Sequence, residues 1–166
     1  MIRDIKKTWK YSINDLGYNY RLTDIQSALG ISQLKKLDQF IKRRNEIAKI
    51  YNNKLKDSDL FEIPKVQKNI SHAYHLYPLK IKFKKLTISK DMLLKKLQSK
   101  GINLQVHYIP IHHHKLYRLK INPRLPNTEI FFEQAISLPV YFSLKKNQIN
   151  YIITNLLKLV YSNIKK

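Results

Sequence analysis

The 166-residue sequence has no cysteine, only three glycines and only 11 acidic residues. Without cysteine the chain forms no disulfide and offers no thiolate, a composition that fits a reducing compartment. The glycines stand at positions 17, 30 and 101, too far apart for a glycine-rich nucleotide-binding loop. The acidic residues are scattered, and no paired carboxylates suited to acid–base catalysis are visible.

Long apolar runs are also missing. No stretch approaches the roughly 20 consecutive apolar residues of a membrane span, and the N-terminal MIRDIKKTWK lacks the apolar centre of a signal peptide. The hydrophobic fraction of 43% is nevertheless that of a globular chain. We therefore expect a folded cytoplasmic protein without membrane association.

Positive charge is in excess, with a formal net charge of +21. Such a charge favours nucleic-acid binding, and a basic nucleic-acid-binding module is the alternative function. However, only six of the 32 basic residues are arginine, and the lysines are spread along the chain. Lysine, isoleucine and asparagine all have AT-rich codons, so a nucleotide-level bias explains the charge without a polyanionic partner.

Apolar periodicity predicts one long amphipathic helix from Asp24 to Leu55. Thr23 as N-cap and Gln26 three residues later form a capping box. Unbroken, this helix would be about 48 Å long. Shorter elements follow: strands at 72–83, 102–111 and 137–142, and helices capped by Ser89, Asn127 and Ser143 that end near residues 100, 136 and 161.

Lysines alternate with apolar residues in the second half of the 72–83 strand, as on a strand with one solvent-exposed face, and Pro78 favours an edge position or a bulge. The order of elements predicts one α/β (α+β) unit, a small and mostly antiparallel sheet covered by helices.

Histidines are the main candidates for chemistry, and four of the six stand at 107, 112, 113 and 114. His112 and His114 would share one face of a continuing strand, so a metal site is one interpretation. We predict no metal site, because the sequence has no His-Glu-x-x-His helix and no evident carboxylate beside these histidines. The imidazoles, with Tyr108 or Tyr117 and Arg118, suit an anionic, polyhydroxylated ligand.

Three segments together resemble the DegT/DnrJ/StrS-type sugar aminotransferases, most closely the transaminases of the pseudaminic-acid and related nucleotide-sugar pathways. They are GYNYRLTDIQSALGISQLKKLDQFIKRRNEIAKIYNNKL (17–55), VHYIPIHHHKLYR (106–118) and PNTEIFFEQAISLPVYFSLKKNQINYIITNLLKL (126–159). The resemblance implies the C-terminal portion of the aspartate-aminotransferase (type I) fold. Residues 1–22 would be a remnant of the large domain, 23–56 a linking helix and 57–166 the C-terminal small domain.

The resemblance also implies a function. Family members are homodimers that use pyridoxal 5′-phosphate to transfer an amino group from glutamate to a keto-sugar nucleotide, in polysaccharide and glycan biosynthesis. Their Schiff-base lysine precedes the segments matched here. We therefore expect a fragment without the catalytic lysine, inactive alone, whose partner is a second copy or a separately encoded N-terminal half.

The resemblance leads us to assign five residues to the site. Asn19 corresponds to a position that reaches the cofactor phosphate of the neighbouring subunit, and Arg21 assists there or contacts substrate. His107 and His112 correspond to positions lining the sugar-nucleotide pocket, and Tyr108 is assigned with them as substrate-binding. His114 departs from the glutamine that is common in the family. Each residue also has a structural alternative: Asn19 as a turn residue, Arg21 as a surface charge, and the histidines as strand-end groups.

Overall fold

The structure, a computed structural model, describes residues 2–3, 11–12, 16–18, 20–117 and 124–165. It consists of two compact units, Met1–Lys36 and Leu37–Lys166. The boundaries at residues 22 and 56 that the family resemblance implies stay a prediction.

In the first unit, strand β1 (Ile2–Arg3) pairs antiparallel with β2 (Tyr11–Ser12), and helix α1 (Asp24–Leu34) follows. The predicted capping box is confirmed, because the Gln26 amide donates to Thr23 Oγ1 at 3.3 Å and the Thr23 amide donates to Gln26 Oε1 at 3.0 Å. The local sequence therefore determines where this helix begins.

The prediction of one unbroken helix from 24 to 55 is wrong. Helix α1 ends at Leu34, and α2 (Leu37–Leu55) begins after a two-residue turn. The Lys36 amide donates to the Gln33 carbonyl at 3.0 Å, an i→i−3 bond that tightens the last turn and closes the helix. Apolar periodicity continues across this turn, which is why the pattern alone did not reveal it.

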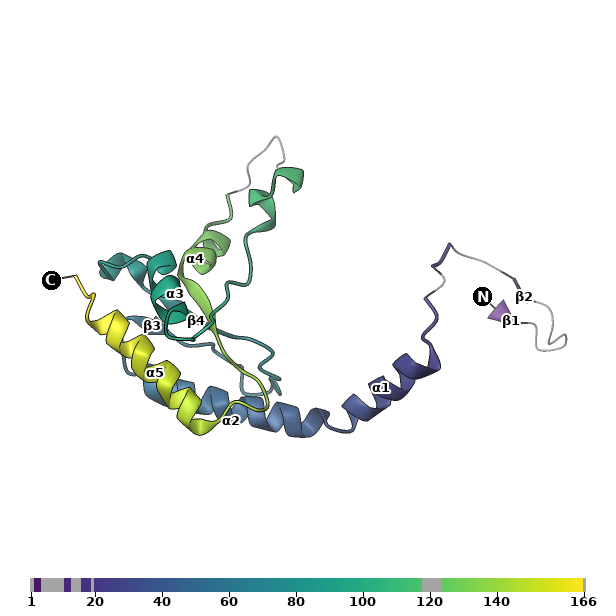
Figure 1. The fold of residues 1–166 in the computed structure, drawn as a ribbon. Coiled ribbons are helices and arrows are strands. Elements are labelled where there is room, and N and C mark those ends of the chain that lie inside the picture. The colour runs from purple at the N-terminus through teal and green to yellow at the C-terminus, as the bar shows by residue number, and fades with distance from the viewer. Residues whose placement is uncertain (1, 4–10, 13–15, 19, 118–123, 166) are drawn as a thin grey trace. The chain divides into compact units, whose positions relative to one another are not determined.

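The second unit is built on a three-stranded antiparallel sheet (Figure 1). Strands β3 (Phe61–Glu62), β4 (Tyr77–Ile81) and β5 (Ala135–Leu138) lie in the order β3-β4-β5. The remaining elements are η1 (Phe83–Lys85), α3 (Lys90–Gln98), η2 (Ile111–His113), η3 (Lys115–Tyr117), α4 (Pro126–Gln134) and α5 (Lys146–Tyr161). This small antiparallel sheet with helices confirms the predicted fold class.

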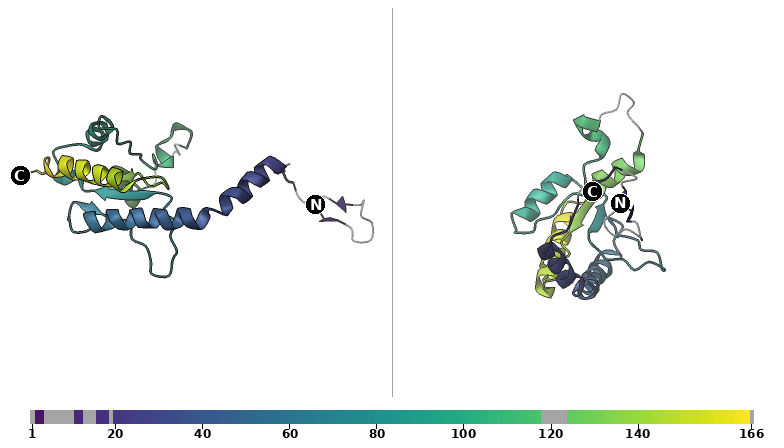
Figure 2. Two further views of the ribbon diagram at one scale, coloured as in Figure 1. Left: turned by 60° about the horizontal axis from the view of Figure 1, so that its bottom comes forward. Right: turned by 90° about the vertical axis from the view of Figure 1, so that its right-hand side faces the viewer.

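Helices α2 and α5 lie side by side, as the views in Figure 2 show, and α3 contacts α5 while α4 contacts β4. The core between these elements consists of aliphatic and tyrosine side chains with no exposure to solvent: Ile47, Tyr51, Leu55, Tyr77, Leu79, Ile81, Leu93, Leu97, Ile149, Leu156 and Val160. Burial raises the pKa of Tyr51 and of Tyr77, and both hydroxyls donate, to the Pro139 carbonyl at 3.0 Å and to Asn52 Oδ1 at 2.6 Å.

Several predicted strands differ from the observed ones. Strand β4 alternates buried and half-buried residues as expected, but it covers Tyr77–Ile81 instead of 72–83. It is the middle strand, but β3 pairs only with its residues Lys80 and Ile81. Pro78 therefore has no partner on the β3 side, and its missing backbone N–H breaks no hydrogen bond between these two strands. The predicted strand at 102–111 is wrong, since only Gln105 forms a bridge there, to Ser137.

Helix boundaries also shift. Ser89 caps α3 as predicted, accepting from the Met92 amide at 3.2 Å. The predictions that Asn127 and Ser143 are N-caps are wrong. Helix α4 already begins at Pro126, and α5 begins at Lys146 with Lys145 as its N-cap. Strand β5 lies at 135–138, two residues before the predicted strand, so α4 ends at Gln134. Among the helices that the structure describes, none has the length and apolarity required to cross a membrane.

Candidate functional site

The loop before η2 is tied to strand β5 through Ser137. The Ser137 amide donates to the Gln105 carbonyl at 2.8 Å, and the Ser137 hydroxyl lies 2.8 Å from His107 Nδ1. Ser137 is the one buried polar residue among those that the structure describes. Because a buried hydroxyl without a partner costs free energy, His107 both satisfies Ser137 and is oriented by it.

A pocket of about 280 Å³ lies beside this contact. Apolar residues make up part of its lining, and the polar residues there include His75, Asn103, Gln105, His107 and Tyr141. A second pocket of about 590 Å³ shares Asn103, Pro139 and Tyr141 with it. Amides and hydroxyls both donate and accept hydrogen bonds, which suits a polar ligand rich in hydroxyl or carbonyl groups.

A cation stands near this pocket. Arg44 Nη1 lies 3.5 Å from Nδ1 of His75, one of the lining residues. The guanidinium carries a permanent charge, so it favours an anionic ligand in the pocket.

The other two predicted substrate residues lie apart from that lining. Tyr108 stacks edge-on against His107 with ring centroids 4.7 Å apart, but 73% of its surface is exposed. His112 is on η2, where its Nε2 lies 2.6 Å from Glu129 Oε1. The structure therefore brings His107 and Tyr108 together and places His112 in a different cluster.

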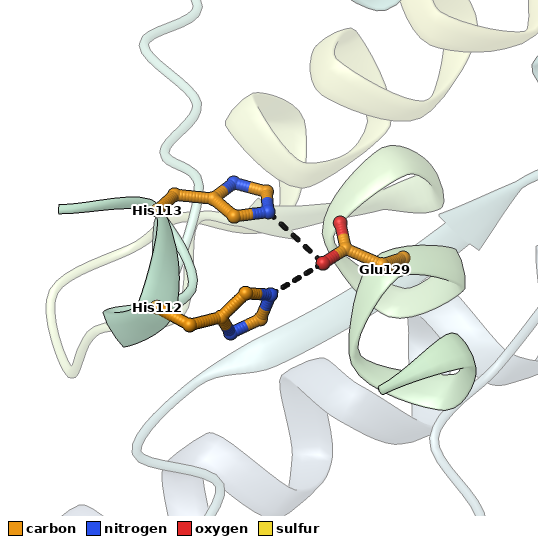
Figure 3. A group of neighbouring side chains, drawn as sticks. All are labelled: His112, His113 and Glu129. Carbon is orange, nitrogen blue, oxygen red and sulfur yellow. Dashed lines mark hydrogen bonds and ion pairs between the residues drawn. The ribbon is translucent and has the colours of Figure 1, made fainter. Parts of the chain in front are cut away.

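That cluster contains His112, His113 and Glu129 (Figure 3). Both imidazole Nε2 atoms approach the same carboxylate oxygen, at 2.6 and 2.9 Å. The hydrogen bond from His112 lowers the pKa of the Glu129 carboxyl, and the bond from His113 adds to that effect. Sequence reasoning missed Glu129, because it is 17 residues from His112 and on another helix. The signal that could have identified it is that Glu129 is an acidic residue in the first turn of the helix that follows the histidines.

The predicted cofactor residues are in the first unit. Asn19 lies outside the described residues, and Arg21 is exposed. Next to them, Tyr18 and Tyr20 expose 83% and 88% of their surfaces, and their stacked rings have centroids 5.3 Å apart.

Pyridoxal phosphate needs a lysine for its Schiff base. The described residues do not provide one at the pocket beside His107. No lysine is among the residues that line it. Burial lowers the pKa of Lys90, a property of Schiff-base lysines, but its ammonium group contacts the carbonyl and the ring of Phe132. Among the described residues, the lining of this pocket therefore offers no lysine for covalent attachment of the cofactor.

Comparisons with known proteins agree with this fold. The chain is 38% identical over 159 residues to Uncharacterized protein MJ1066 of Methanocaldococcus jannaschii, covering 94% of this chain and 41% of that protein. It is 32% identical over 156 residues to the UDP-4-amino-4,6-dideoxy-N-acetyl-beta-L-altrosamine transaminase of Campylobacter jejuni, covering 93% of this chain and 41% of that enzyme. The chain thus spans about two fifths of the length of the curated relatives it matches.

A solved structure matches almost the whole chain. Helicobacter pylori PseC, an aminotransferase involved in the biosynthesis of pseudoaminic acid, superposes with a TM-score of 0.82 at 34% identity, covering 98% of this chain and 43% of that chain. The model of the DegT/DnrJ/EryC1/StrS aminotransferase family matches residues 2–157. The chain therefore belongs to the DegT/DnrJ/EryC1/StrS aminotransferase family.

Proposed function

We propose that this chain is the C-terminal portion of a pyridoxal-phosphate-dependent transaminase that transfers an amino group from glutamate to a keto-sugar nucleotide in surface-glycan synthesis. The observation that carries the proposal is the match of 98% of the chain to the Helicobacter pylori aminotransferase, with 34% identity and a TM-score of 0.82. A likeness at this identity supports a shared function as well as a shared fold.

In this proposal the Schiff-base lysine comes from an N-terminal portion of the family fold, carried on the same polypeptide or on a separate one. The match of about two fifths of each relative supports this division. When bound, the cofactor supplies the electron sink for moving the amino group. The 166 residues alone then neither attach the cofactor nor transaminate.

The part played by this chain is to hold the sugar nucleotide. Asn103 and Gln105 offer amides and Tyr141 a phenol to the hydroxyl and carbonyl groups of a ligand, while Ser137 fixes the imidazole of His107. Arg44 beside His75 favours the negative charge of the diphosphate.

Tyr108, with 73% of its surface exposed, is free to stack on a ligand ring. The family motif also assigns His112 to the sugar nucleotide, although its imidazole lies in the separate cluster with Glu129. Asn19 and Arg21 would bind the cofactor phosphate, in a homodimer or with the N-terminal portion. The assignment of His107 rests on the family motif together with its place in the pocket lining, whereas those of His112, Asn19 and Arg21 rest on the motif alone.

Helix α1 supports the need for a further protein portion. It buries none of its side chains, and its apolar residues Ile25 and Leu29, which are one turn apart on the same face, expose 83% and 60% of their surfaces. A contiguous exposed apolar stripe marks an interface. We assign this stripe to the N-terminal portion of the enzyme, because that is the part of the family fold to which this chain does not correspond.

Complementation tests the proposal. The chain would be co-expressed with the N-terminal portion of the Helicobacter pylori transaminase, cut before the region matched here, and assayed with glutamate and a keto-sugar nucleotide. We expect amino transfer only when both parts are present, and a raised KM for the sugar nucleotide with His107→Ala. Turnover by the 166-residue chain alone, or a pair no more active than the N-terminal portion, would contradict the proposal.

A further inference from the structure

Three potential metal ligands converge on one point of the second unit. His112 and His113 are consecutive residues of the η2 turn, and Glu129 projects from the first turn of α4, as Figure 3 shows. Their ligand atoms all lie within 4.8 Å of one another. The imidazole centroids are 4.5 Å apart and the rings stand at 78°, so the two Nε2 atoms reach Glu129 Oε1 from different directions.

The backbone and neighbouring side chains hold these groups in place. The η2 turn is closed by the His113 amide donating to the Pro110 carbonyl at 2.9 Å, and the Glu129 amide donates to the Leu125 carbonyl at 3.1 Å. The His113 ring also packs edge-on against Phe132 at 5.8 Å. The ligand atoms are thus brought together by the fold, and no loop closure is needed to assemble them.

Two imidazoles and one carboxylate form a ligand set typical of zinc and related divalent transition metals. Around a tetrahedral ion with ligand bonds of about 2.1 Å, neighbouring ligand atoms are about 3.4 Å apart. The two Nε2–Oε1 distances are 2.6 and 2.9 Å, so side-chain rotations that open them by about 0.8 and about 0.5 Å reach the separation of ligands around an ion. The fourth position is left for water.

The exposure of the ligands permits exchange with solvent. The His112 side chain is 12% exposed, whereas those of His113 and Glu129 are 38% and 37% exposed. One imidazole is therefore held inside the protein while the other two ligands open to the surface. Binding would replace the hydrogens that the two imidazoles share with Glu129 Oε1, so protons compete with the metal.

We propose that His112 Nε2, His113 Nε2 and one oxygen of Glu129 bind a single divalent transition-metal ion of the Zn²⁺ class, with water completing its coordination. Mg²⁺ is not a suitable occupant, because it prefers oxygen ligands in an octahedron. This site would stand against our expectation from the sequence that the chain binds no metal, and the carboxylate missing from that reasoning is Glu129.

Calorimetric titration tests this proposal on the full 166-residue chain, produced without a polyhistidine tag and stripped with a chelator. Titration with ZnCl₂ at pH 7.5 should give one ion per chain, and titration with MgCl₂ should give no binding. Glu129→Gln and His113→Gln should each weaken zinc binding about tenfold or more. His114→Gln removes a neighbouring exposed histidine outside the cluster and should leave the affinity within about twofold.

Circular dichroism shows whether each variant is folded, and the two ligand variants give independent readings if one of them is not. Absence of zinc binding by the parent chain would overturn the proposal. So would a Glu129→Gln or His113→Gln protein that binds zinc as tightly as the parent, or a loss of binding in His114→Gln alone. Because no sugar nucleotide is used, the outcome does not depend on the proposed transaminase function.

Discussion

The imidazole of His107 and the hydroxyl of Ser137 lie 2.8 Å apart and join the 102–110 loop to strand β5. Ser137→Ala should lower the free energy of unfolding by about 1 kcal/mol, since it removes a partly buried hydrogen bond. It should also free His107 to leave the pocket. Urea denaturation measures the first effect.

Ser99→Ala is the matched control, because that exposed hydroxyl donates to the Lys96 carbonyl at 2.9 Å. It should cost less than Ser137→Ala. Equal losses would mean that the His107 contact does not contribute to stability.

Leu156 on α5 has no exposed surface and lies in the core of the second unit. Leu156→Ala should destabilise the chain by about 2–5 kcal/mol, because it removes buried apolar atoms and leaves a cavity. Leu116→Ala, at a residue with 84% exposure, should change the stability by about 0.5 kcal/mol or less. Similar urea midpoints for the two variants would contradict the packing described here.

Replacing two of the glycines with alanine should change stability in opposite directions. Gly30 is inside α1 with no atom within 4 Å of an added Cβ, so Gly30→Ala should stabilise that helix by about 1 kcal/mol. Gly101 lies in the turn after α3 with φ +74°, so Gly101→Ala should destabilise the chain by about 1 kcal/mol. Hydrogen exchange in residues 24–34 checks the first effect, and urea denaturation checks the second. Slower exchange should accompany Gly30→Ala.

Acid should weaken the fold through two ion pairs. Lys85 donates to Asp59 and Lys80 donates to Glu62, and these hydrogen bonds hold the pKa of each carboxyl below its usual range. A pKa lower in the folded than in the unfolded chain gives stability that is present above the unfolded value of about 4 and disappears as pH falls through the folded value. Thermal unfolding midpoints should therefore decline below about pH 4.5.

Glu62→Gln should make that decline shallower. Glu133→Gln changes the same charge at an exposed position of α4 and serves as its control. An equally steep acid decline in Glu62→Gln and the parent chain would show that the Lys80 pair does not contribute.

The alternative of nucleic-acid binding predicts a different behaviour. We expect any association of the +21 chain with duplex DNA to be lost at about 0.15 M salt, because unpatterned lysines bind phosphates only through screened charge. Fluorescence polarisation with a labelled duplex measures this. Tight binding that persists at that salt concentration would favour the nucleic-acid function.

Local signals in the sequence predicted part of the fold correctly. The Thr23–Gln26 capping box, the Ser89 cap and the alternation of β4 depend on neighbours only a few residues apart. The break after Leu34 was not predictable from periodicity, because both α1 and α2 carry apolar residues at helical spacing.

Contacts between residues far apart in the sequence were harder to predict. The 102–111 segment has the composition of a strand, but only Gln105 finds a partner on β5. Likewise, the motif histidines were visible as candidates, whereas their contacts with Ser137 and Glu129 depend on how β5 and α4 pack. Side-chain partners 17 and 30 residues away follow from tertiary structure and leave no periodic trace.

The central claim is that this chain contributes to a transaminase site without supplying the Schiff-base lysine. The direct measurement is to incubate the purified 166-residue chain with pyridoxal phosphate, alone and with the N-terminal portion of the Helicobacter pylori transaminase, reduce with borohydride, and locate pyridoxyl-lysine by mass spectrometry. We predict a stoichiometric adduct only on a lysine of the N-terminal portion. A stoichiometric adduct at one lysine of the 166-residue chain would contradict the account.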